Sequence, residues 1–166
     1  MKLISKLFLL LILTTILSCS GKEEKKKEPI NYGRKEAPVT KVEPIDKSTP
    51  ASKKIDLTNK GVGPIKSLAL NETIDSELAA HGAEVYKNLC TACHRIDKKF
   101  IGPAPKGILE RRTPEWVMNM ILDPEGMVKN DPLAKELLIE FNGSPMANQN
   151  LSENDARAVL EYFRTL

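Results

Sequence analysis

Five consecutive residues carry the most specific chemistry in the chain: Cys90, Thr91, Ala92, Cys93 and His94. Two thiols three positions apart can each add to one vinyl group of the same porphyrin, and the histidine that follows can then ligate its iron. The C-x-x-C-H pattern therefore indicates a covalent attachment site for one c-type haem. Cys90 and Cys93 are the expected attachment residues, and His94 is the expected proximal ligand of the iron.

Three other interpretations of this motif are weaker. A zinc site needs two more ligands at suitable spacing, but the only other cysteine is Cys19 and the only other histidine is His81. A thioredoxin-like dithiol is expected near a βαβ pattern, and no such pattern is visible in the sequence. The third alternative is a solvent-facing cysteine pair followed by an incidental histidine.

The elements that must position this motif begin with an N-terminal export pattern. Lys2 and Lys6 flank the start of an apolar run over residues 7–17. This run is shorter than the roughly 20 apolar residues of a membrane-spanning helix, and it fits the apolar region of a signal peptide. Residues 16–19, Ile-Leu-Ser-Cys, resemble the lipobox of bacterial lipoproteins. That resemblance implies a signal peptide over residues 1–18 and a lipid anchor on Cys19; an ordinary signal peptide is the alternative.

Residues 19–60 have the composition of a flexible linker. A charged run over residues 22–28 is followed by scattered prolines, and Tyr32 is the only aromatic residue. Such a segment buries too little apolar surface to offset the entropy of ordering, so we predict a disordered tether. Residues 61–70 add glycines and periodic apolar side chains, and we expect them to form a strap packed on the domain that follows.

The charge balance does not indicate a nucleic-acid-binding protein. The formal net charge is +3, but residues 70–166 hold 11 Lys and Arg against 15 Asp and Glu. The excess of positive charge therefore belongs to the N-terminal part of the chain. The C-terminal domain is mildly acidic.

The pattern of residues 71–166 indicates an all-α domain of about four helices, which begin near residues 75, 114, 132 and 153. Thr113-Pro114 and Asp131-Pro132 are typical helix starts, and Ser152-x-x-Asp155 has the form of a capping box. Residues 124–131 are polar and turn-rich, so we expect a loop there. His81 is expected to face solvent rather than bind iron.

Two further motifs extend the pattern on both sides of the cysteines. Gly82-x-x-Val85-Tyr86 precedes them, and Gly102-Pro103-x-x-x-Gly107 follows them. In this order the motifs resemble class I, mitochondrial-type monohaem cytochromes c. The resemblance implies a small cytochrome c fold around one covalent haem. It also implies that Tyr86 meets Tyr162 or Phe163 where the terminal helices cross.

The same resemblance assigns roles around the haem. It implies that the Pro103 carbonyl oxygen accepts a hydrogen bond from His94, and that Met146, in the loop before the last helix, is the distal ligand. Met127 is the second candidate for that ligand, whereas Met118 and Met120 are expected in the core. Candidate partners of a haem propionate are Trp116, Arg111 and Arg112, the alternatives being a core tryptophan and solvated arginines.

The implied function is electron transfer rather than catalysis. A lipid-anchored monohaem cytochrome c would take one electron from a respiratory donor, either a quinol-oxidising complex or another cytochrome, and pass it to a terminal reductase or oxidase. The spacing of Arg111-Arg112-x-Pro114-Glu115 and Asp131-Pro132 is similar to that of Bacteroidetes cytochromes associated with nitrous oxide reductase; cytochrome oxidase is an equal alternative as acceptor.

The expected location is the bacterial cell envelope, on a membrane and facing the periplasm. The Lys22-Glu23-Glu24 run is also similar to a surface-export signal of Bacteroidetes lipoproteins, which makes the cell surface a second expected location. The competing functional hypothesis is a haem-based sensor or peroxidase-like protein, in which Met146 does not bind iron and the distal position is open.

Overall fold

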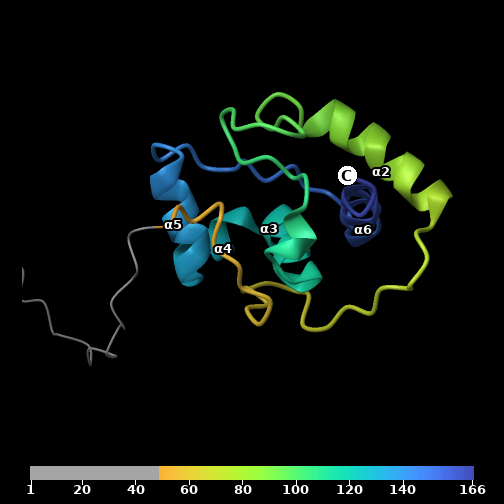
Figure 1. Cartoon of the computed structure of the whole chain (residues 1–166), viewed down its shortest axis with the longest axis horizontal. Helices are drawn as coiled ribbons and strands as arrows, with labels where there is room; N and C mark the ends of the chain where they lie inside the picture. Colours follow the sequence, from red (N-terminus) through yellow and green to blue (C-terminus); the bar gives the residue numbers. More distant parts are fainter. Residues whose placement is uncertain (1–48) are drawn as a thin grey trace, which may run out of the picture. The chain divides into compact units, whose positions relative to one another are not determined.

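The computed structural model describes residues 49–166 (Figure 1). The predicted signal peptide, Cys19 and the linker up to residue 48 lie outside the described residues. Within them the structure has five α-helices, one 3₁₀ helix and no strand, which confirms the all-α prediction. In chain order they are α2 (Ser76–Leu89), η1 (Ile108–Glu110), α3 (Pro114–Leu122), α4 (Pro124–Asn130), α5 (Pro132–Glu140) and α6 (Glu153–Phe163). None of the helices over residues 49–166 is both long and apolar enough to cross a membrane.

Three successive helices begin with the same local chemistry. Thr113, Asp123 and Asp131 precede α3, α4 and α5, and each side chain accepts a hydrogen bond from a backbone N–H group of the first turn. A proline follows each cap, where its fixed φ suits the helix and its missing N–H group is not needed. These starts fix three short helices at sharp angles to one another.

The loop predicted over residues 124–131 is wrong, because α4 occupies it. Asp123 caps the new helix by accepting from the Gly126 N–H group at 3.0 Å. Met127, the second candidate for the distal ligand, is fully buried on α4. Its sulfur accepts from the Val62 N–H group at 3.0 Å, and the side chain is part of the core.

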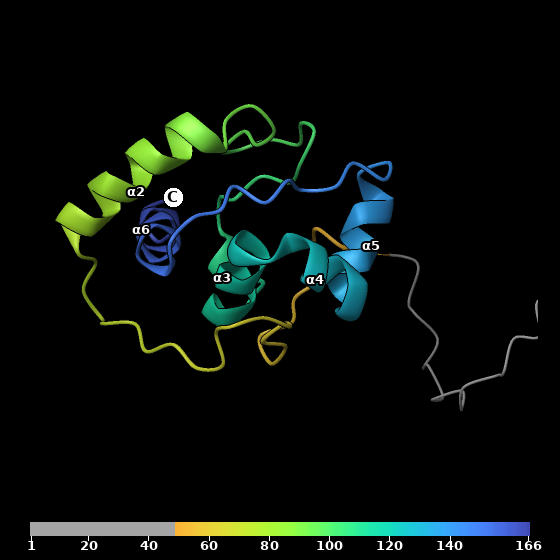
Figure 2. The same cartoon turned by 180° about the vertical axis from the view of Figure 1, so that it is seen from behind.

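The first and last helices cross at Gly82, as both views of the chain show (Figures 1 and 2). A Cβ atom on Gly82 would lie 1.9 Å from the Ala158 carbonyl oxygen, so only glycine permits this approach. The Tyr86 ring packs against Tyr162 and Phe163, with centroid distances of 5.6 and 5.7 Å. This confirms the expected aromatic contact and holds the end of α2 against α6.

Gly82→Ala is expected to lower the free energy of unfolding by about 2–3 kcal/mol, because the methyl group must push the two helix backbones apart. Urea unfolding of the haem-loaded protein followed by circular dichroism measures this change. Glu84→Ala, on an exposed position of the same helix, is the matched control and should change stability by less than about 0.5 kcal/mol. Equal stability of the two variants would contradict a close crossing at Gly82.

Residues 49–60 do not continue the flexible linker, contrary to the predicted boundary at residue 60. Ala51 is buried, and the Ser52 backbone and hydroxyl groups both donate to the Glu140 carboxylate at 2.7 Å. Asn59 donates to Asp131 at 2.7 Å. These side chains find their partners on helices more than 50 residues further along the chain, so composition alone could not reveal the packing.

Residues 61–70 lie along α3 on the way to α2 (Figures 1 and 2). Asn119 on α3 accepts from the Ile65 N–H group at 2.9 Å and donates to the carbonyl oxygens of Lys60 and Ile65. Ile65 is buried in the core. The segment therefore covers the face of α3 that lies away from α6.

Candidate functional site

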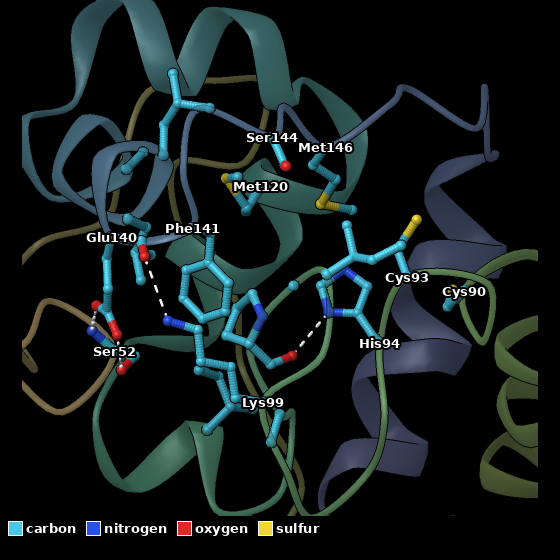
Figure 3. Close-up of a pocket in the computed structure, with 18 of the residues that line it drawn as sticks. Ser52, Cys90, Cys93, His94, Lys99, Met120, Glu140, Phe141, Ser144 and Met146 are labelled. Carbon is cyan, nitrogen blue, oxygen red and sulfur yellow. Dashed lines mark hydrogen bonds between the residues drawn. The ribbon is translucent and has the colours of Figure 1, made fainter.

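The turn after α2 gathers the two cysteines and the histidine. Cys90 ends the helix, and its carbonyl oxygen accepts from the backbone N–H groups of Cys93 and His94 at 3.1 and 2.9 Å. The Tyr86 hydroxyl donates to the His94 carbonyl oxygen at 3.2 Å, which ties the turn to the helix. Figure 3 shows Cys90, Cys93 and His94 on the same side of one cavity.

The His94 ring is fixed from two sides. Its Nδ1 atom lies 2.8 Å from the Pro103 carbonyl oxygen, as the resemblance implied. A carbonyl oxygen can only accept, so Nδ1 carries the proton and Nε2 keeps a free lone pair. Gly102 packs against the ring, and a Cβ atom there would lie 2.5 Å from His94 Cε1. This is the arrangement of a metal-binding histidine whose second nitrogen is oriented by a backbone acceptor.

The cavity beside this ring has a volume of about 570 Å³, within the range of small-molecule and cofactor sites. Its walls come from the turn after α2, from η1, α3, α4 and α5, and from the loop before α6. Most of the wall side chains are apolar. They include Ile101, Ile108, Met120, Val128, Leu137, Leu138, Phe141 and Met146.

Two thioethers line the cavity. Met146 is half-buried in the loop before α6, and Figure 3 shows its side chain directed into the cavity that the His94 ring also faces. Met120 on α3 also lines the cavity, although the sequence favoured a core position for it. Met118 is buried in the core as expected. Met127 is not among the residues of the cavity wall.

The three candidate propionate partners all line the cavity but differ in their free donors. The Trp116 indole N–H donates to Asp131 at 3.2 Å, and this is the only donor of its side chain. A propionate role for Trp116 is therefore contradicted, and the side chain is a buried core residue. Arg111 and Arg112 each keep a buried Nε atom without a partner in the described residues. Those two N–H groups fit a carboxylate acceptor.

The thiol chemistry argues against a dithiol redox site. Burial, reinforced by the neighbouring Cys93, raises the pKa of the Cys90 thiol to about 11. Reactive cysteines instead have a lowered pKa, because the thiolate is the nucleophile. A free Cys90 thiol would stay protonated at neutral pH, which favours a pair that is consumed by covalent attachment.

One wall of the cavity was missed by the sequence interpretation. Pro50, Ser52 and Lys53 line it, together with Glu140 and Lys99. Lys99 donates to the Glu140 carbonyl oxygen at 3.3 Å, and its ammonium group lies 4.5 Å from the centroid of the Phe141 ring. The only sequence signal for this wall was the turn-forming Pro50-Ala51-Ser52 stretch, which is equally typical of a linker.

Comparisons with known proteins agree on one family. A family model described as cytochrome c matches residues 79–166. The chain is similar to a solved structure of cytochrome c from Rhodothermus marinus, with 41% identity, a TM-score of 0.61 and coverage of 70% of this chain and 92% of that chain. It is also similar to an engineered cytochrome c from Rhodothermus marinus bound to a carbene intermediate, with 40% identity, a TM-score of 0.58 and coverage of 70% and 93%. A search of curated proteins by sequence finds no match.

Proposed function

The chain belongs to the cytochrome c family, and we propose that it is a membrane-anchored carrier of single electrons between a respiratory donor and a terminal reductase or oxidase. Membership of the family implies one covalently bound haem c and a role in electron transfer. The observation that carries the proposal is the convergence of Cys90, Cys93, His94 and Met146 on one apolar cavity.

The residues of the cavity fit a haem c. Two thiols three positions apart lie at its rim with a histidine whose Nε2 atom is free, and two arginine Nε atoms without partners can receive the carboxylates of the porphyrin. When bound, haem c supplies an iron that holds or releases one electron. His94 would bind the iron from the proximal side, oriented by Pro103, and Met146 would bind it from the distal side.

The walls of the cavity favour a carrier over a catalyst. Apolar side chains exclude water from the site, and a thioether ligand from Met146 would keep small molecules away from the iron. Cytochromes with histidine and methionine ligands have raised reduction potentials, which suits donation to a terminal enzyme. The wall includes no second histidine that could handle a proton in peroxide chemistry.

The surface beside the attachment turn suits a weak redox encounter. Leu89, Ile96, Phe100 and Ile101 are exposed there. The basic residues Arg95, Lys98, Lys99 and Lys106 surround them, against Asp97 alone among the acids of residues 95–106. This surface is positive on a domain that is acidic as a whole, so the partner it fits presents an acidic surface.

Electron transfer and the basic surface are tested together by stopped-flow oxidation of the reduced protein. The rate with anionic hexacyanoferrate(III) should fall as salt is added, and Lys98→Glu should lower it about threefold to tenfold at low salt. Lys129→Glu, exposed on α4 and outside the cavity wall, is the matched control and should have little effect. Equal effects of the two substitutions would contradict steering by this surface.

The anchor and the location are part of the proposal. Residues 16–19 resemble a lipobox, so Cys19 would carry the lipid, and residues 20–48 would link it to the domain. Tethering raises the effective concentration of a weakly binding carrier near membrane-bound partners. The proposed location is the bacterial cell envelope, facing the periplasm, and nitrous oxide reductase or cytochrome oxidase is the proposed acceptor.

A further inference from the structure

The segment Pro50–Asp56 holds the guanidinium group of Arg112. Arg112 Nη2 donates to the Ala51 carbonyl oxygen at 2.6 Å, and Nη1 donates to the carbonyl oxygens of Lys54 and Arg111. The Asp56 N–H group donates to the Arg111 carbonyl oxygen at 2.9 Å, which joins the segment to the chain beside Arg112. Arg112 is only 1% exposed, so the segment fixes a buried cation.

The remaining donor of this cation has no partner in the described residues. Arg112 lines the cavity, and its Nε atom is buried and unpaired. Burying a donor without an acceptor is costly, and here the cost is imposed by backbone groups that bind the other side of the guanidinium. The geometry therefore reserves the Nε–H group for an acceptor that is not part of residues 49–166.

Two acidic side chains of α5 anchor the segment. Both oxygens of Glu140 accept from Ser52, from the backbone N–H group and from the hydroxyl group, at 2.7 Å each. One turn earlier, Glu136 accepts from the Lys54 ammonium group at 2.6 Å. Ser52 and Lys54 thus flank the two bonds between the segment and Arg112. We call these four side chains the clamp.

We propose that the clamp is a positioning device: it holds the Pro50–Asp56 segment so that Arg112 presents its Nε–H group to a haem propionate, and thereby raises the reduction potential. This inference rests on the proposed function, since it requires the haem. Ser52 and Glu140 act through Arg112 and not by contact with the iron.

The effect on the potential follows from charge. Oxidation adds one positive charge to the site, and a propionate that has lost its cation stabilises that charge. A fixed guanidinium neutralises the propionate and so favours the reduced state. The interaction is strong because a buried pair is poorly screened by solvent and salt.

Two variants of the full-length, haem-loaded protein test the clamp by spectroelectrochemical titration. Ser52→Ala removes one hydrogen bond without changing any charge, and should lower the equilibrium constant for reduction about threefold. Glu140→Gln weakens both bonds to Ser52 and should lower it about tenfold, which is about 59 mV for a one-electron couple. The double variant should lie close to Glu140→Gln, because both changes break the same contact.

The direction of the change separates the clamp from a simple charge effect. Removing the negative charge of Glu140 would by itself raise the potential, so a rise in Glu140→Gln, or an unchanged potential in Ser52→Ala, would overturn the proposal. Ser67→Ala, at an exposed position of the strap, is the control and should leave the potential unchanged. Wild-type protein that carries no haem or shows no reversible one-electron couple would overturn the proposed function as well.

Discussion

Replacing Met146 with alanine is expected to convert the iron from a low-spin to a high-spin state and to lower its reduction potential more than any other substitution in the cavity wall. The reason is the loss of the soft thioether, which raises the potential of a histidine-ligated haem. We expect a fall on the order of 0.2 V, within the roughly 0.8 V over which axial ligands set haem potentials. Absorption spectroscopy and a redox titration of the same sample measure both effects.

Met120 provides the matched control, because it carries the other thioether of the cavity wall. Met120→Leu keeps the volume and removes the sulfur, and it should leave the iron low-spin with a similar potential. The opposite pattern, a high-spin iron in Met120→Leu and a low-spin iron in Met146→Ala, would assign the distal ligand to α3 instead of the loop before α6.

Substitution of both Cys90 and Cys93 by alanine is expected to abolish covalent haem attachment and most of the helical structure. The domain is built around an apolar cavity of about 570 Å³. At about 24 cal/mol per Å³, a dry cavity of that size costs on the order of 10 kcal/mol, comparable to the entire stability of a typical domain. Water that enters reduces this cost but leaves apolar walls hydrated.

Two measurements follow this loss. Haem absorbance of the denatured, size-separated chain reports covalent attachment, and far-ultraviolet circular dichroism reports helix content. Thr91→Ala lies between the two cysteines and removes only a hydroxyl that donates to the Lys87 carbonyl oxygen, so it should retain both signals. Haem that stays on the denatured double variant would contradict attachment through these thiols.

Features that depend on local chemistry could be predicted from the sequence. The attachment turn is specified by five consecutive residues, and the starts of α3 and α5 are specified by a capping side chain followed by proline. The approach of Gly82 to α6 and the contact of Tyr86 with Tyr162 and Phe163 came from the family resemblance.

Features that depend on distant partners could not be predicted. Residues 49–60 read as linker because their hydrogen-bond partners, such as Glu140, lie on α5. Trp116 was a plausible propionate donor until Asp131 was seen to accept from its indole N–H group. Met120 follows the helical spacing of a core residue, and only the packing of α3 against the cavity separates it from Met118.

The absorption spectrum of the full-length protein, purified from cells that attach haem c, tests the central claim most directly. An electron carrier with His94 and Met146 as ligands predicts a low-spin spectrum in both redox states. It also predicts the weak long-wavelength band of ferric iron bound to a thioether, and no rapid change when carbon monoxide is added to the reduced protein. A high-spin spectrum with ready binding of carbon monoxide would contradict the electron carrier and favour a haem-based sensor or peroxidase-like protein.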